Sequence, residues 1–438
     1  MPAFSRSRAR GERTRRIGLW HRLTQAAKPQ IFRVMKLRIA AFAAMALYGL
    51  VAKAADYDTY GGWTKLHGGK TGYFHTEQIG GRWWLVTPEG NVFFSKGVDH
   101  VNYAPESDSA PKAPSDTTAW AKMATGQLYR WNFNTAGAWS AAALYTTGIG
   151  YTPIVNIAAA VARDVWLKGL VVDYFSPEFR EAADRAAASA CAPHARDPWL
   201  LGYFTDNELR WGSDWRGKES LLEAYLKMPS SSPGYARAVA LLKERGRDDD
   251  ALADEDKSAF LELVAAEYAR VSTDAIRRHD PNHLILGCRF AGYAGDAVMR
   301  GVGPYFDVIS FHSYSANAPI DRLELIHKLT GKPTMVTEFS FKAMDSGLPN
   351  TKGAARPVAT QEDRAKGFAG YVEALAALPN CVGFHWFEYR DEPAEGRRPD
   401  GENSNYGVVK IDFTPWDVLT RRTTEVNARI ESLHAASK

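Results

Sequence analysis

Two acidic residues at the ends of apolar runs are the groups in this chain best suited to do chemistry. The stretch "TDNELRWG" places Asp206, Asn207 and Glu208 directly after the apolar run "WLLGYF". A second run, "PTMVTEF", brings Glu338 to its end in the same way. Charged groups at the end of a buried strand cost free energy unless they are paired or used. Two carboxylates in one cleft can divide acid and base work, which is the requirement for cleaving a glycosidic bond.

These residues need a fold that gathers strand ends, and the chain has the pattern of one. After residue 90, eight short β-rich runs alternate with helical patterns. The runs are NVFFSKGVDHV, NTAGAW, TPIVNIAA, LLGYFTDNE, LILGCRFA, FDVISFHSY, PTMVTEFSF and CVGFHWFEY. This alternation favours an α/β fold with a parallel sheet, and eight units over about 350 residues predict a (β/α)₈ TIM barrel. The rival, an open doubly wound sheet, needs a glycine-rich phosphate turn that the first strand lacks.

Three segments are predicted along the chain. Residues 1–54 form a leader and signal peptide, residues 55–91 a small N-terminal β-hairpin cap, and residues 92–438 the catalytic barrel. The cap is indicated by "GKTGYFHTEQIGGRWWLVTPEGNVFF", where apolar and polar residues alternate around the turn signals "GG" and "PEG".

The leader has the three parts of a secretory signal. The segment "MKLRIAAFAAMALYGLVAKAAD" begins at Met35 with a basic start, an apolar middle and the small-residue site "AKA", which predicts cleavage before Ala55. Met35 is then the true start, and residues 1–34 are an over-long start assignment or a disordered basic leader. No other segment approaches the length of a membrane span. We expect a periplasmic or secreted protein that has no membrane contact after cleavage.

Composition narrows the function classes. Residues 1–54 hold 12 of the 54 lysines and arginines but one of the 50 acidic residues, so the remainder has 42 basic and 49 acidic residues and a net charge of −7. A mildly acidic mature chain argues against a nucleic-acid partner. Three cysteines without paired spacing, and no paired histidines, indicate neither a metal site nor a cofactor.

Other strand ends offer polar and aromatic groups for binding a substrate. These are Asn102 after the first run, His312 and Tyr314 in the sixth, and Trp386 and Glu388 in the eighth. Because side chains alternate along a strand, His385 and Trp386 cannot both face the barrel axis. We expect Trp386 in the site and His385 outside it. A serine hydrolase is disfavoured because the G-x-S-x-G motif is absent.

The motifs resemble a known family. "NE" after the fourth run and "TEF" at the seventh are similar to the retaining glycoside hydrolases of clan A. "WWLVTPEGNVFFSKGVDHV", "WLLGYFTDNELRWG", "DPNHLILGCRFAG", "TEFSFKAMDSGLPNT" and "TQEDRAKGFAGY" resemble the β-agarase group, glycoside hydrolase family 50 and its agarase-like relatives. The resemblance implies Glu208 as the general acid/base and Glu338 as the nucleophile.

The resemblance to the β-agarase group also implies binding roles for three residues. Asn207 would hold the hydroxyl next to the reacting carbon, Tyr314 would sit against the nucleophile, and Trp386 would form a sugar platform. The leading hypothesis is an exported retaining hydrolase of β-glycosidic bonds in a galactose-containing polysaccharide or oligosaccharide. The alternatives are a clan relative acting on another β-glycan, such as a β-glucan or β-galactoside, and a non-catalytic sugar-binding barrel. The last is disfavoured because both carboxylates are intact.

Overall fold

The structure is a computed structural model that describes residues 56–104, 107–108, 114–247 and 252–437. The chain divides into two units, Met1–Tyr57 and Asp58–Lys438. The predicted signal peptide lies outside the described residues. Among the described helices, none combines the length and the apolar character needed to cross a bilayer.

The first strands form an antiparallel sheet. Its strands are β1 (Trp63–His67), β2 (His75–Ile79), β3 (Arg82–Val86) and β4 (Asn91–Phe93), in the order β1-β4-β3-β2. The turn between β2 and β3 uses Gly80 and Gly81, which both have positive φ. The sheet is larger than the expected hairpin because β1 pairs with β4 across the segment that separates them.

This sheet packs on one end of the central strands. Phe74, Leu85 and Phe93 form an apolar cluster with residues at the amino ends of those strands, among them Leu201 and Met335. The N-terminal sheet therefore covers the end of the central strands opposite to the one where Glu208 and Glu338 lie.

The central strands are parallel. Six of them, in the order β10-β11-β14-β5-β6-β7, form one sheet. They are β5 (Ser95–Val98), β6 (Thr135–Ala136), β7 (Gly150–Tyr151), β10 (Ile309–His312), β11 (Thr334–Phe339) and β14 (Cys381–Trp386). A parallel pair, β8 (Gly202–Tyr203) and β9 (Leu284–Ile285), is joined to β7 and β10 by isolated parallel bridges. Seven of these strands fall in the runs identified in the sequence, while β7 ends directly before the third run, TPIVNIAA, which holds only an isolated bridge at Ile154. The expected parallel sheet with helices is confirmed.

Helices follow the strands. They are α2 (Thr117–Arg130), α3 (Val165–Lys168), α4 (Pro177–Ala190), α5 (Leu221–Leu226), α6 (Pro233–Glu244), α7 (Asp254–His279), α8 (Asp296–Val302), α9 (Ile320–Thr330), α10 (Gln361–Ala377), α11 (Asp417–Asn427) and α12 (Ile430–Ala436). Short 3₁₀ turns are η1 (Ala142–Thr146), η2 (Ala158–Ala160) and η3 (Ala192–His194). Several of the α-helices begin at a side-chain cap. In α4, the hydroxyl of Ser176 accepts a hydrogen bond from the backbone N–H of Phe179, and Pro177 occupies the first turn.

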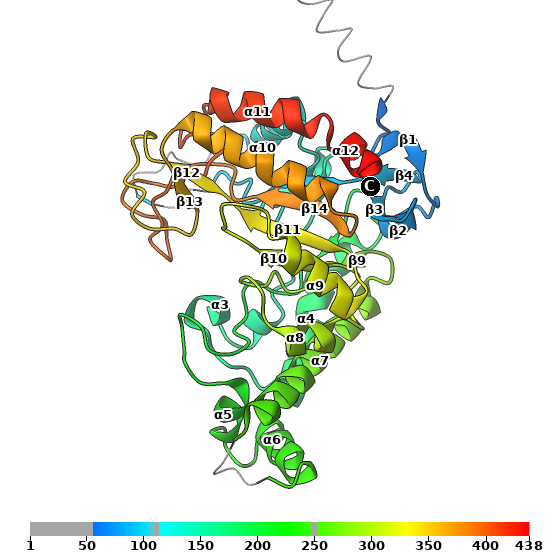
Figure 1. Cartoon of the computed structure of the whole chain (residues 1–438), viewed down its shortest axis with the longest axis vertical. Coiled ribbons are helices and arrows are strands. Elements are labelled where there is room, and N and C mark those ends of the chain that lie inside the picture. The colour runs from blue at the N-terminus through cyan, green and yellow to red at the C-terminus, as the bar shows by residue number, and fades with distance from the viewer. Residues whose placement is uncertain (1–55, 105–106, 109–113, 248–251, 438) are drawn as a thin grey trace, which may run out of the picture. The chain divides into compact units, whose positions relative to one another are not determined.

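The helices cover the sheet and leave the carboxyl ends of the strands to loops. Helix α10 lies over β14 and beside α11 (Figure 1). Helices α5 and α6 pack against α7 and lie at the bottom of that view. Two further short strands, β12 (Phe341–Ala343) and β13 (Arg356–Val358), pair in the loop region after β11. The loops at the carboxyl ends of the parallel strands carry much of the wall of the candidate site.

Candidate active site

Glu208 and Glu338 are brought together from different strands. Glu208 follows β8 in a left-handed backbone conformation with φ of 46°, and Glu338 lies near the end of β11. His312, the last residue of β10, lies between them. Its Nδ1 atom is 2.7 Å from Oε1 of Glu208 and 3.2 Å from Oε2 of Glu338. One carboxylate oxygen of each glutamate therefore lies within 4.8 Å of the other.

Glu338 is held by three donors. Besides His312, Nη2 of Arg289 lies 2.8 Å from Oε1, and the hydroxyl of Tyr314 donates to Oε2 at 2.7 Å. Burial raises the pKa of Tyr314 well above its usual value, and the charge of Glu338 adds to this effect, so the hydroxyl remains a donor. These contacts fix the carboxylate in one orientation and leave little of it exposed to water, since the residue is 6% exposed.

Arg289 is a site residue that the sequence analysis missed. It follows β9, is fully buried, and spreads its guanidinium over several partners. Nη1 donates to Oδ1 of Asn207 at 2.8 Å, while Nη2 donates to Asp99 at 2.5 Å as well as to Glu338. A planar guanidinium can hold an amide and two carboxylates at once. The signal in the sequence was an arginine inside the apolar run "LILGCRFA".

The two glutamates differ in their tendency to ionise. Burial on its own would raise the pKa of Glu208, but the hydrogen bond from His312 and the nearby arginine charges outweigh it and lower that pKa. Burial raises the pKa of Glu338, and the charge of Glu208 adds to this, although Arg289 acts in the opposite direction. Two acids in one site with pKa values displaced in opposite directions do not lose their protons together.

Asp206 turns away from this pair. Its carboxylate accepts from the backbone N–H of Ala158 at 2.9 Å and from the hydroxyl of Tyr268 at 2.7 Å, so it closes the start of η2. Full burial raises the pKa of Asp206 to about 7, against these hydrogen bonds. Its neighbour Asn207 uses its carbonyl oxygen for Arg289 and lies at the cavity, where its amide nitrogen can serve as a donor.

A cavity of about 510 Å³ opens above the glutamates. Its volume lies within the usual range for small-molecule sites. The cavity is lined by His100, Asn102, Ala104, Trp139, Trp166, Asn207, Glu208, Tyr314, Glu338, Ala354, Phe387, Arg397, Arg398, Pro399, Asp400 and Glu402. Five residues predicted to be catalytic or substrate-binding are among them: Asn102, Asn207, Glu208, Tyr314 and Glu338. The two tryptophans supply aromatic faces, Trp139 from the loop after β6 and Trp166 from the short helix α3.

The predicted orientation of Trp386 and His385 is wrong. Trp386 is fully buried, its ring packs against Phe339 and Phe368, and its indole N–H donates to a backbone oxygen. His385 points the other way, where Nε2 lies 3.0 Å from the hydroxyl of Ser95 and Nδ1 lies 3.3 Å from Asp99. Neither residue lines the cavity.

A glycine explains which of the two faces inward. His385 lies beside Gly97 of the neighbouring strand β5, and a Cβ atom at Gly97 would come within 2.2 Å of the imidazole. The absence of a side chain at Gly97 makes room for the imidazole, and alternation then turns Trp386 toward α10. Trp386 is therefore part of the helix–sheet core.

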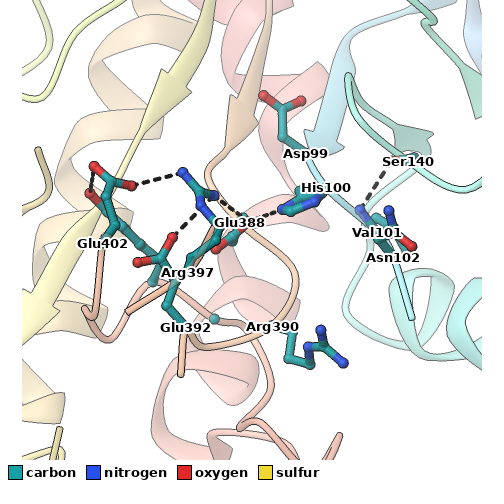
Figure 2. A network of polar contacts seen from close by, with 12 residues as sticks. Asp99, His100, Val101, Asn102, Ser140, Glu388, Arg390, Glu392, Arg397 and Glu402 are labelled. Atoms are coloured by element: carbon teal, nitrogen blue, oxygen red, sulfur yellow. Dashed lines mark hydrogen bonds and ion pairs between the residues drawn. The ribbon is translucent and has the colours of Figure 1, made fainter. Parts of the chain in front are cut away.

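The prediction that Glu388 contacts the substrate is also wrong. Glu388 is 1% exposed and lies behind the wall of the cavity, where it contacts His100 and Arg397. Figure 2 shows the network: Arg397 lies among Glu388, Glu392 and Glu402, with His100 approaching Glu388 from the other side. Because His100, Arg397 and Glu402 line the cavity, Glu388 supports the wall from behind.

Glu208, His312 and Glu338 have donor atoms of the types that bind divalent cations, each within 4.8 Å of the others. The same atoms are joined at hydrogen-bond distances of 2.7 Å and 3.2 Å. A cation at this point would also face the guanidinium of Arg289, which contacts Glu338. This arrangement favours a hydrogen-bonded pair of carboxylates over a metal centre.

Comparison with known proteins agrees with the motifs. No family model matches the chain. β-Agarase B of Vibrio sp. (strain JT0107) is 27% identical over 484 residues, which cover 85% of this chain and 50% of that protein. β-Agarase A of the same strain is 27% identical over 451 residues, or 79% of this chain and 44% of that protein. The chain is a relative of the β-agarases. It spans about half the length of the curated relatives that it matches.

Solved structures share the fold of this β-agarase relative. The agarase AgWH50C superposes with a TM-score of 0.74 at 24% identity, over 90% of this chain and 70% of that one. BpGH50 superposes with a TM-score of 0.75 at 24% identity, over 88% of each chain. An exo-β-agarase gives a TM-score of 0.75 at the same identity, over 87% of this chain and 68% of that one. The expected resemblance to β-agarases of glycoside hydrolase family 50 is confirmed.

Proposed function

We propose that the chain is an exported retaining glycoside hydrolase that cleaves β-glycosidic bonds in a galactose-containing polysaccharide or oligosaccharide. The relatives described above are β-agarases by name, and agarose is the substrate to test first. We propose also that the eight parallel strands form a (β/α)₈ barrel whose amino-terminal end is covered by the sheet β1 to β4. The cyclic sequence of strand pairs and bridges supports this arrangement.

The observation that carries the proposal is the pair of carboxylates. Oxygen atoms of Glu208 and Glu338 lie within 4.8 Å of each other at one side of the cavity. Carboxyl groups about 5 to 5.5 Å apart suit attack by one of them on the sugar, whereas about 6.5 to 9.5 Å leaves room for an inverting water. The short separation favours double displacement with retention.

In the first step Glu338 attacks the anomeric carbon while Glu208 protonates the leaving oxygen. The bond from the sugar to the leaving group breaks, and an ester bond to Glu338 forms. In the second step Glu208 removes a proton from water, which attacks the anomeric carbon and releases Glu338 as a carboxylate. Arg289 and Tyr314 stabilise that carboxylate through their hydrogen bonds.

The reaction requires a proton on Glu208 and a charge on Glu338, whereas in the free site the pKa of Glu338 is the raised one. Substrate binding therefore has to move the proton toward Glu208. The contact with His312 is the largest of the effects that lower the pKa of Glu208 against burial, and the charges of Arg289 and Arg216 add to it. A sugar that displaces this contact removes the largest lowering effect and raises the pKa of Glu208 toward the acid form.

Two further residues are proposed to contact the sugar. The amide nitrogen of Asn207 donates to the hydroxyl next to the anomeric carbon, a bond that strengthens as the ring becomes oxocarbenium-like. Asn102 lies at the cavity with its side-chain oxygen occupied by the backbone N–H of Tyr103. His312, which was predicted to bind the substrate, is buried and does not line the cavity, and it positions both glutamates from the end of β10.

The test is a screen of product release on several glycans, followed by a determination of the anomeric configuration of the first product. Reducing-sugar release is measured on agarose, porphyran, β-glucans, mannan and nitrophenyl glycosides, which separates agarase activity from cleavage of another β-glycan. Proton NMR then follows the first product formed from the best substrate. We expect a β-anomer before mutarotation. An initial α-anomer contradicts Glu338 as the nucleophile, and no release from any glycan contradicts hydrolase activity itself.

A further inference from the structure

The most exposed large apolar side chain of the described residues is Trp215, at 67%. A single exposed apolar residue needs no explanation by itself. Trp215 differs because its segment, in the loop after Glu208, is held rigidly. Indole rings in fixed positions offer large contact area at low conformational-entropy cost on binding.

The segment is closed as a tight turn. The backbone N–H of Asp214 donates to the carbonyl of Gly217 at 2.8 Å, and the backbone N–H of Arg216 donates to Oδ1 of Asp214 at 2.7 Å. The guanidinium of Arg216 also binds the carboxylate of Asp214 at 2.6 Å and is 4% exposed. Trp215 therefore projects from a turn in which both adjacent residues, Asp214 and Arg216, are held by hydrogen bonds.

Arg216 connects this turn to the cavity wall. Its Nη1 atom donates to the backbone oxygen of Glu208 at 2.6 Å and to that of Trp166. Gly169 makes this approach possible, because a Cβ atom there would lie 2.7 Å from Cβ of Arg216. Trp166 lines the cavity, so one arginine ties the exposed indole both to the proposed acid/base residue and to an aromatic wall of the site.

The same arginine covers one face of the indole. The guanidinium carbon of Arg216 lies 4.2 Å from the centre of the Trp215 ring. The rest of the Trp215 side chain is largely open to water, since the residue is 67% exposed. A ring with one face fixed against a cation and the other open to water presents a flat apolar surface at a constant angle.

We propose that Trp215 is a sugar-stacking platform outside the cavity, which binds a further unit of the saccharide chain whose cleaved bond lies between Glu208 and Glu338. The ligand class is a neutral pyranose unit, whose C–H face stacks on an indole while its hydroxyls remain in water. The continuous contacts from Glu208 through Arg216 to Trp215 place this platform at the edge of the same site. The inference rests on the proposed function.

The experiment compares chain lengths. Values of kcat/KM are measured for neutral agarose oligosaccharides from tetrasaccharide to decasaccharide, with wild type, Trp215→Ala, Trp215→Phe and the control Met123→Ala. Met123 is 40% exposed on α2 and controls for removing an exposed apolar side chain. We expect Trp215→Ala to lower the ratio of kcat/KM between decasaccharide and tetrasaccharide about tenfold, which corresponds to about 1.4 kcal/mol. Trp215→Phe retains most of this ratio.

Equal losses at all chain lengths, or no loss at any length, overturn the platform while wild-type hydrolysis still supports the proposed function. A second measurement covers the case in which wild type hydrolyses none of these oligosaccharides. Titration calorimetry with Glu338→Gln, with and without Trp215→Ala, against the glycans of the screen then tests binding directly. Weaker binding of a glycan without Trp215 supports the platform, and unchanged or absent binding overturns it.

Discussion

The guanidinium of Arg289 lies 2.8 Å from the carboxylate of Glu338, and Arg289 itself is fully buried. The same side chain holds Asp99 and the carbonyl oxygen of Asn207. A single cation in the segment after β9 thus contacts both the proposed nucleophile and the amide expected to bind the sugar. Its charge opposes the effect of burial on the pKa of Glu338, as does the charge of His312.

Arg289→Lys should lower kcat/KM by about 10²-fold or more. Lysine keeps the charge but cannot bind an amide and two carboxylates in a planar fork, and small displacements of reacting groups cost about this much. The control is Arg364→Lys, since Arg364 is equally buried but donates to the backbone oxygens of Phe341 and Gly407. We expect the control to lower the melting temperature and to leave kcat/KM within a few fold. Equal kinetic losses in both variants would show that Arg289 is only structural.

Glu208→Gln should move the acid limb of the pH profile to lower pH. A raised pKa keeps Glu338 protonated above its ordinary value of 4.5, so kcat/KM falls as pH drops through the raised value. The charge of Glu208 contributes to that rise, and its removal lowers the pKa of Glu338. A nitrophenyl glycoside is the suitable substrate because its leaving group needs little protonation and kcat/KM reports the first step alone. An unchanged acid limb would show that the two carboxylates do not interact.

Glu338→Gly should lose nearly all activity and recover part of it in azide. A small anion can occupy the space of the missing carboxylate and attack the anomeric carbon, which yields a glycosyl azide of inverted configuration. Proton NMR identifies that product. Azide that restores sugar release without any glycosyl azide among the products would contradict nucleophilic attack by Glu338.

Trp386→Ala should lower stability far more than catalysis. The side chain is fully buried against Phe339 and Phe368, and loss of such an aromatic side chain costs about 3 to 5 kcal/mol of unfolding free energy. Trp139→Ala is the comparison, because Trp139 lines the cavity and its loss should raise KM with less effect on stability. Urea unfolding and kinetics of both variants distinguish the two positions. A large rise in KM with stability unchanged in Trp386→Ala would restore it as a sugar platform.

Export should remove the leader. The site "AKA" predicts a mature chain that begins near Ala55. Mass spectrometry of the exported protein measures its N-terminus directly. A mature form that retains Met1 or Met35 would contradict processing at this site.

The strands and the acidic pair were predictable from local patterns. Seven of the eight β-rich runs contain one of the parallel strands, and the third run begins directly after β7, because period-two alternation and flanking turn residues are properties of a short segment. The positions of Glu208 and Glu338 followed as well, since the carboxyl ends of parallel strands gather at one side. The quoted motifs were specific enough to identify the relationship to β-agarases.

The direction of individual side chains depended on contacts between distant segments. Whether His385 or Trp386 faces inward is decided by Gly97, which lies 288 positions earlier in the chain than His385 and leaves room for one imidazole. Arg289 looked like an interruption in an apolar run until Asp99, Asn207 and Glu338 surrounded it. A charge becomes stable in the interior only through partners supplied by other strands, and pairing of that kind leaves no trace in local periodicity.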